Sequence, residues 1–266
     1  MNICFITTKL DISAGGASIS LDIMARNLIK SGHGVKILTL EARNGALQEL
    51  PYQILDIGPS KFPYYIDLRK SLIVRMSELS SWADVYHVFN PWLAPLVMSA
   101  KKEFDQPAVL RFNSLSTVCS NRTLINNNCY KSCNASKLFN HSPRSKFERV
   151  KRIPEYLFRQ NLLLSYVNRF DLIIAVSSGV RSVISDMGAD EAKIAVIPNC
   201  ADPRLKSSNE SVKNLFKSNV ETLLWAGRLI RAKQPSKVIK MMRLLPDNLN
   251  LHILGSGPEK KNLTKI

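Results

Sequence analysis

The sequence lacks the patterns expected of a transmembrane helix and of a secretory leader. None of its apolar runs approaches the ~20 residues of a transmembrane helix, and the N-terminal stretch MNICFITTKLDIS lacks a basic region followed by an apolar core. We therefore expect a cytoplasmic protein. At 266 residues and 45% hydrophobic content, the chain is long enough for two compact domains or one large one.

Cysteine is also scarce, with five residues in the chain. An odd and sparse set argues against a disulfide framework. Cys119, Cys129 and Cys133, followed by His141, raise the alternative of a zinc site, but C-x9-C-x3-C lacks the tight paired spacing of common structural zinc sites. We expect free thiols and no metal site.

Acidic residues are few, with 21 Asp and Glu against 37 Lys and Arg, a formal charge of +16 and a pI near 9.8. The excess is greatest in residues 101–170, which hold 13 basic and 4 acidic residues. Such a segment attracts phosphorylated substrates, anionic lipid headgroups or nucleic acid, although a solvated helix face accounts for it equally well. The three tryptophans are scattered along the chain. We therefore regard nucleic acid as an unlikely partner.

Short apolar strands alternate with helical stretches along the chain. The first helix follows NICFITT, carries Ala17, Leu21, Met24 and Leu28 on one face, and ends at Gly32 and Gly34. The later strands read VKILTL, YQILDI, DVYHVFN, AVLRFNS, DLIIAVS and KIAVIPN, with the helical stretch WLAPLVMSAKKE between two of them. Near-continuous apolar strands separated by helices predict an α/β fold with a doubly wound parallel sheet.

Breaks in this alternation predict the domain boundaries. We assign residues 1–202 to an N-terminal Rossmann-like domain, with an inserted loop at about 114–161 that leads into a helix. Residues 203–219 are polar and suited to a linker. Residues 220–266 contain ETLLWAGRL, PSKVIKMMRLL and LNLHILGSG, which form a strand-helix-strand run and a partial second domain.

Ligands of doubly wound sheets bind beyond the carboxyl ends of the strands. Gly15 and Gly16 follow the first strand and would let backbone N–H groups approach an anion at the start of a helix. Their spacing is not G-x-G-x-x-G, so they are no dinucleotide fingerprint, and a plain turn explains them equally well.

The second domain offers two such loops. Gly227, Arg228 and Lys233 follow one strand, and Gly255 and Gly257 follow the next. A guanidinium and an ammonium in this position would hold a diphosphate. Two ordinary surface cations are the alternative, and the neighbouring glycine loop favours the diphosphate clamp.

The ordered motifs resemble the retaining glycosyltransferases of family 4. The resemblance is carried by AVSSGVRSVISDMGADEAKIAVIPNCAD, LLWAGRLIRAKQP and LHILGSGPE, together with AGGAS and DVYHVFNPW. It implies the GT-B fold of two facing Rossmann-like domains, the second of them incomplete here. It also implies a nucleotide-sugar donor as substrate, no cofactor, no metal and retention of the anomeric configuration.

The resemblance also implies roles for individual residues. Arg228 and Lys233 match the pair that binds the donor diphosphate and stabilises its departure. Gly16 matches the glycine loop near that diphosphate, and Gly15 lies beside it. Gly255 and Gly257 match the loop beside the nucleotide. We also expect Gly227, next to Arg228, to bind the donor. Asn113 stands where many members have a histidine that contacts the transferred sugar. His87 faces the acceptor side or is a satisfied core or rim histidine.

Some family features are absent or displaced. Cys200 stands where the family usually has a glycine after Pro-Asn, and the E-x7-E carboxylate pair is expected beyond residue 266. Glu41 and Glu49 have this spacing by coincidence. The absence of a D-x-D motif leaves a metal-chelating route without evident ligands.

These observations predict a glycosyltransferase that transfers a sugar to a saccharide or lipid-linked acceptor. Fixed cations would stabilise the charge that develops on the leaving diphosphate. The basic segment 141–169 would hold the protein against an anionic membrane surface. The alternative is an inactive truncated fragment, or a binding subunit that depends on a partner.

Overall fold

A computed structural model describes residues 1–12, 16–42, 50–57, 66–115, 134–141, 145–151, 165–201, 221–230 and 233–265. The chain divides into two compact units, Met1–Asp202 and Pro203–Ile266, here called the N-terminal and C-terminal units. The predicted linker at 203–219 lies outside the described residues, as does most of the predicted insertion.

The N-terminal unit contains a seven-stranded sheet. Its strands are β1 (Asn2–Thr7), β2 (Gly34–Thr39), β3 (Gln53–Asp56), β4 (Val85–Val88), β5 (Ala108–Phe112), β6 (Leu172–Ala175) and β7 (Ile194–Val196). Their order is β3-β2-β1-β4-β5-β6-β7, and every pairing is parallel. All seven strands coincide with predicted apolar runs, because strands buried on both faces carry a nearly continuous hydrophobic signal.

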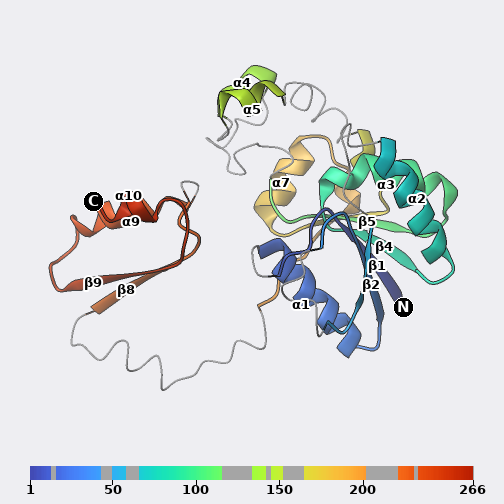
Figure 1. Ribbon diagram of the computed structural model, residues 1–266, viewed down its shortest axis with the longest axis horizontal. Coiled ribbons are helices and arrows are strands. Elements are labelled where there is room, and N and C mark those ends of the chain that lie inside the picture. The colour runs from blue at the N-terminus through green and yellow to red at the C-terminus, as the bar shows by residue number, and fades with distance from the viewer. Residues whose placement is uncertain are drawn as a thin grey trace. The chain divides into compact units, whose positions relative to one another are not determined.

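Helices and short 3-10 turns connect the strands or follow them in the described part of the N-terminal unit. The helices are α1 (Gly16–Lys30), α2 (Ile66–Ser80), α3 (Ala94–Ala100), α4 (Ala135–His141), α5 (Lys146–Lys151) and α7 (Ser178–Asp186), with 3-10 turns η2 (Pro91–Leu93), η3 (Lys101–Glu103) and η4 (Glu191–Lys193). Helix α1 packs on one face and α2, α3 and α7 pack on the other (Figure 1). None of the helices in the described ranges is long and apolar enough to span a membrane.

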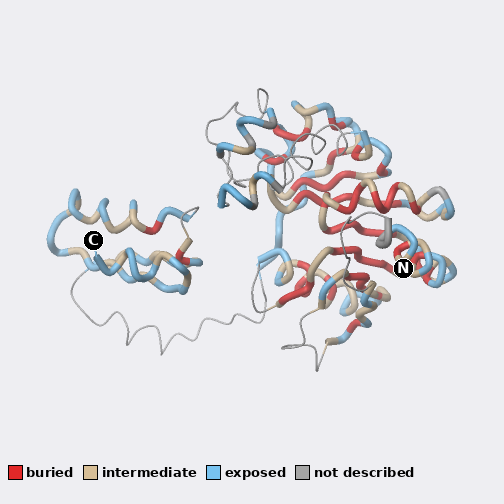
Figure 2. The backbone as a smooth tube through the Cα atoms, turned by 45° about the horizontal axis from the view of Figure 1, so that its top comes forward, coloured by how far each residue is buried: buried red, intermediate tan, exposed pale blue. Residues whose placement is uncertain are grey.

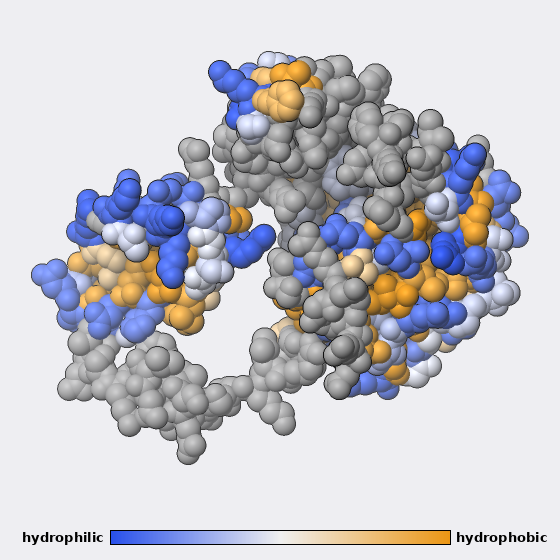
Figure 3. Space-filling model, viewed as in Figure 1, coloured by the Kyte–Doolittle hydropathy of each residue, from blue (hydrophilic) through white to orange (hydrophobic). Residues whose placement is uncertain are grey.

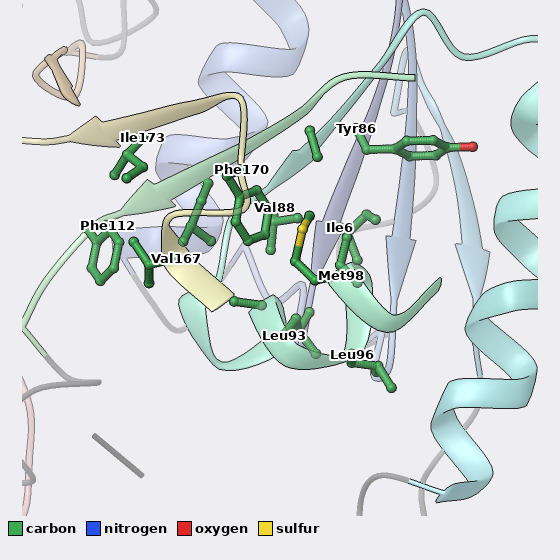
Figure 4. Packing of buried hydrophobic residues seen from close by; sticks show 14 of the residues in the cluster. Ile6, Tyr86, Val88, Leu93, Leu96, Met98, Phe112, Val167, Phe170 and Ile173 are labelled. Carbon is green, nitrogen blue, oxygen red and sulfur yellow. The ribbon is translucent and has the colours of Figure 1, made fainter. Parts of the chain in front are cut away.

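Alternate residues of β1 belong to two separate hydrophobic clusters, one on each face of the sheet. In β1, Cys4 and Ile6 join the cluster under α2 and α3, whereas Ile3 and Phe5 join the cluster under α1. Figure 4 shows the larger cluster, in which Phe170 and Val88 pack close to the helix that carries Met98. The strands form the most deeply buried part of the unit (Figure 2). Their carboxyl ends are therefore held on a rigid base.

Two details of the helices differ from the sequence predictions. The first helix is confirmed, with Leu21 buried, but Ala17 is exposed because it lies in the first turn. Helix α2 was not predicted, although Leu72, Met76 and Leu79 are buried at helical spacing. The exposed Val74 adds an apolar residue outside this buried face and blurs the pattern.

The described part of the C-terminal unit contains two parallel strands and two helices. These are β8 (Glu221–Ala226), α9 (Pro235–Met242), β9 (Leu249–Leu254) and α10 (Lys260–Leu263). Several large apolar side chains of this unit are exposed, among them Leu224, Met241, Leu244 and Leu254. Hydrophobic residues are visible between hydrophilic ones on its surface in Figure 3.

Candidate functional site

The carboxyl ends of β1 and β4 are joined by hydrogen bonds. The backbone N–H of Phe89 donates to the carbonyl oxygen of Ile6 at 2.8 Å. The side chain of Asn90 continues the connection, since its Nδ2 donates to Thr8 Oγ1 at 2.7 Å and its Oδ1 caps the following 3-10 turn. These bonds place the residues that follow the two strands at one edge of the sheet.

Asn113, the predicted sugar contact, lies just past β5 at the same edge. Its Nδ2 donates to the carbonyl oxygen of Phe89 at 3.2 Å, and its Oδ1 accepts from Nε of Arg111 at 3.1 Å. The side chain is partly exposed. The structure therefore holds Asn113 by both ends of its amide and leaves part of it accessible.

Arg111 is a member of this edge that sequence reasoning missed. The residue has no exposed surface, although arginine is seldom fully buried without a partner. Its Nη2 donates to the carbonyl oxygen of Ile197 at 3.0 Å and to Oδ1 of Asn199 at 2.9 Å, both in the turn after β7. Within the described ranges no carboxylate forms an ion pair with it. A cation inside the apolar run AVLRF was the signal that could have identified it.

Burial affects the electrostatics of Arg111 and of its neighbour His87. Desolvation lowers the pKa of Arg111, and the neighbouring Cys200 opposes this shift. Desolvation, followed by the charge of Arg111, lowers the pKa of His87 from 6.5 to about 3. At neutral pH the buried cation of Arg111 therefore lies near a neutral imidazole.

His87, the predicted acceptor-side residue, lies within β4 and is 9% exposed. Its ring stacks near Phe5, with 4.9 Å between ring centroids, and its Nε2 is buried without a hydrogen-bond partner among the described residues. The sequence left two alternatives, a histidine that faces the acceptor side and a satisfied core or rim histidine, and this burial is typical of a core position. As a core histidine, His87 has incomplete hydrogen bonding, because its Nε2 atom is unpaired.

The predicted glycine pair after β1 is described only in part. Gly15 lies outside the described residues. Gly16 is the first residue of α1, and a β-carbon there would meet nothing within 4 Å. Packing in this unit does not require glycine at position 16, so its donor-binding role stays a prediction.

The C-terminal unit brings its predicted residues together more closely. Gly227 follows β8 and Gly255 follows β9, and Gly227 N–H donates to Leu254 at 2.9 Å. Leu229 N–H donates to the carbonyl oxygen of Ser256 at 2.8 Å. The β8 and β9 loops therefore form one continuous rim.

Close backbone contact explains two of the glycines in this rim. A β-carbon at Gly255 would lie 1.8 Å from Gly227 O, and one at Gly257 would lie 2.3 Å from Leu229 O. Both glycines also have positive φ angles, 151° and 156°, which side chains disfavour. The glycines are needed for the two loops to touch.

Arg228 and Lys233, the predicted diphosphate clamp, lie between β8 and α9. Both residues are exposed. Gln234, next to Lys233, has the left-handed φ of 51° and directly precedes Pro235 at the start of α9. A non-glycine residue in this conformation is uncommon, and it sets the turn that leads from Lys233 into the helix. The two cations therefore belong to the same rim as the glycine loop.

No metal site is found in the described part of the chain, where no three His, Cys, Asp or Glu residues cluster. Cys119, Cys129 and Cys133 lie outside the described residues, so the zinc alternative is not decided. Of the described cysteines, Cys4 is buried, Cys200 is exposed, and both are free thiols. Glu41 is described and Glu49 is not.

Comparison with known proteins identifies the family. The family model described as Glycosyltransferase Family 4 matches residues 14–205, well over half of the chain. The chain belongs to glycosyltransferase family 4. No match was found among curated proteins.

Solved structures that resemble this chain have the same fold. The Anabaena protein HepE, solved in complex with UDP-glucose, is 15% identical, with a TM-score of 0.66 over 100% of this chain. A glycosyltransferase from Rickettsia africae (16%, TM-score 0.60) and sucrose-phosphate synthase from Thermosynechococcus elongatus (13%, TM-score 0.64) each match 99% of it. The predicted α/β, GT-B type fold is confirmed.

The chain is shorter than these relatives. It spans 64% of HepE, 62% of the Rickettsia protein and 65% of sucrose-phosphate synthase. At these identities the structural likeness establishes the fold, and the activity is considered separately below.

Proposed function

We propose that this family-4 protein binds a nucleotide sugar and transfers its sugar, with retention and without a metal, to a saccharide or lipid-linked acceptor. The observation that carries the proposal is the joined rim of the C-terminal unit, where the β8 and β9 loops meet through Gly227 and Gly255. Arg228 and Lys233 belong to that rim and are exposed. HepE was solved with UDP-glucose, which makes this compound the first probe to use.

Charge explains why two cations suit this reaction. Cleavage of a glycosyl phosphate bond places negative charge on the leaving nucleoside diphosphate. A guanidinium and an ammonium held by the rim would stabilise that charge more in the transition state than in the ground state. Arginine offers a planar fork of donors to two phosphate oxygens, and lysine adds a mobile point charge.

Calorimetric titration of the full chain with UDP-glucose, UDP, GDP-mannose and ADP-glucose tests donor binding. We expect saturable binding of at least one nucleotide sugar, with the same affinity in excess EDTA. Lack of binding by all four would contradict the proposal. A loss of binding in EDTA would overturn metal independence alone.

Turnover is tested separately on the same chain. We expect slow release of free sugar from the bound donor in water, and NMR of the anomeric proton should show the donor's configuration in the first product. Inversion would contradict the retaining mechanism. Donor binding without any turnover would favour the partner-dependent binding subunit.

We also propose that the basic segment 141–169 holds the protein against an anionic membrane. In its described part, α5 exposes 71% of Phe147 and 56% of Val150 beside the exposed Lys146. Apolar side chains next to cations are typical of segments that bind the headgroup region. Sedimentation with neutral and with anionic phospholipid vesicles tests this membrane binding. Equal binding to both kinds of vesicle would contradict the proposal.

A further inference from the structure

Arg111 connects residues from strands that are not adjacent. Its backbone belongs to β5, but its guanidinium reaches the turn after β7, across the intervening β6. The turn is tied to β6 as well, because Ile197 N–H donates to Ala175 O at 2.9 Å. Through Asn113 the same network reaches Phe89, next to β4. One buried side chain therefore braces the carboxyl edge from β4 to β7.

The chemistry of arginine decides which way the Asn113 amide points. A guanidinium has donors and no acceptor, so the atom that faces Nε must be the amide oxygen. The nitrogen then faces the carbonyl oxygen of Phe89, which only accepts. The reversed amide would place two donors together at one end and two acceptors at the other. The Asn113 amide is thereby fixed with its oxygen toward Arg111 and its nitrogen toward Phe89.

One N–H of Asn113 remains for a ligand. Nδ2 has two hydrogens, and one of them bonds to Phe89. The second has no acceptor among the residues that the structure describes. Asn113 is partly exposed whereas Arg111 is fully buried, so only the asparagine is accessible to a ligand.

We propose that Arg111 is a positioning residue, which orients Asn113 so that its free N–H donates to a hydroxyl oxygen of the sugar. This inference rests on the proposed function. Asn199 anchors the opposite end of the guanidinium. Arg111 itself does not touch the substrate.

Two substitutions test the network from its two ends. Arg111→Lys keeps a positive charge and removes the planar fork. Asn199→Leu removes the hydrogen-bond partner of the guanidinium. Because Asn199 is exposed, an apolar side chain is tolerated there, and this variant should fold even if Arg111→Lys does not. Arg75→Lys is the matched control, because Arg75 pairs with Glu78 on the surface of α2.

The first measurement is the amide NMR spectrum of the ¹⁵N-labelled full chain. In the free protein we expect the Asn113 side-chain peaks to shift in Arg111→Lys and in Asn199→Leu, and to stay in place in Arg75→Lys. Unchanged Asn113 peaks in both network variants would overturn the proposal. This readout needs no donor, so it separates failure of the network from failure of the proposed function.

The second measurement compares the Kd values for UDP-glucose and for UDP. Loss of one oriented hydrogen bond to the sugar should raise the Kd for UDP-glucose about tenfold in both network variants. The Kd for UDP should stay within about twofold of the wild-type value, because UDP lacks the sugar. A parallel rise in both Kd values, or no rise in either, would overturn the positioning role. Wild-type protein that binds neither compound would instead contradict the proposed function for a UDP-sugar.

Discussion

A β-carbon added to Gly255 would lie 1.8 Å from the carbonyl oxygen of Gly227, which belongs to the neighbouring strand's loop. No side-chain rotation can relieve this contact, because the backbone of residue 255 fixes the position of the β-carbon and the oxygen belongs to the backbone of Gly227. The φ of 151° at Gly255 adds strain for any other residue. The rim that carries Arg228 therefore requires glycine at position 255.

Gly255→Ala should therefore destabilise the C-terminal unit by at least ~2 kcal/mol, from strain and steric overlap together. Limited proteolysis followed by mass spectrometry should show earlier cleavage within residues 221–265. Gly179→Ala is the matched control, because its β-carbon would come no closer than 3.9 Å to Ser177 Oγ. Equal protease resistance of the two variants would contradict the close contact.

Removal of either rim cation should weaken donor binding. Arg228→Ala and Lys233→Ala should each raise the Kd for UDP-glucose at least about tenfold, since charge-assisted hydrogen bonds are stronger than neutral ones. Turnover, where it is measurable, should fall by orders of magnitude because charge develops in the transition state. Lys240→Ala, an exposed cation in the last turn of α9, is the control. Unchanged binding and turnover in both rim variants would exclude the clamp.

The buried imidazole of His87 should make stability depend on pH. Its pKa is about 3 in the folded protein and 6.5 in an ordinary setting. The unfolded chain therefore takes up the proton first, and stability is lost as the pH falls from about 6.5 toward 3. Between pH 7 and pH 5 the loss from this group should be about 2 kcal/mol.

Urea denaturation of the wild type and of His87→Phe at pH 7 and pH 5 measures this contribution. The aromatic replacement keeps a flat ring near Phe5 and Phe89 and removes the titrating group. The variant should lose less stability than the wild type on acidification. An identical loss in both proteins would show that His87 does not titrate in this way.

Asp22 should be the most sensitive polar residue of α1. Its Oδ1 accepts from Nε of Arg26 and from the hydroxyl of Tyr52, each at 2.8 Å, and the side chain is 1% exposed. Asp22→Ala should cost about 3 kcal/mol, because it leaves a partly buried guanidinium without its partner. Tyr52→Phe removes one hydrogen bond and should cost ~1 kcal/mol.

The control for Asp22 is Arg75→Ala, which breaks the exposed pair with Glu78 and should change stability by less than ~0.5 kcal/mol. Chemical denaturation of the three variants gives the comparison. A cost for Asp22→Ala as small as that of Arg75→Ala would contradict the importance of its buried contacts.

The sequence alone determined the fold class and the positions of the strands. Buried parallel strands such as Leu172–Ala175 are apolar on both faces, so their signal is local and survives without tertiary information. Helix α2 was missed because an apolar residue outside its buried face, the exposed Val74, blurs the helical period of Leu72 and Met76. The loops that carry Arg228 and Gly255 were also found from sequence, because each directly follows a recognisable strand.

Only the tertiary structure decided how residues far apart in the chain combine. Arg111 and Asn199 are separated by 88 positions, and their hydrogen bond exists because β5 and β7 lie in one sheet. The contact of Gly255 with Gly227 likewise depends on the pairing of β8 with β9. A sequence pattern indicates which residues of a single helix or strand are buried. Hydrogen bonds and steric limits between distant elements depend on distances that are set when the sheet forms.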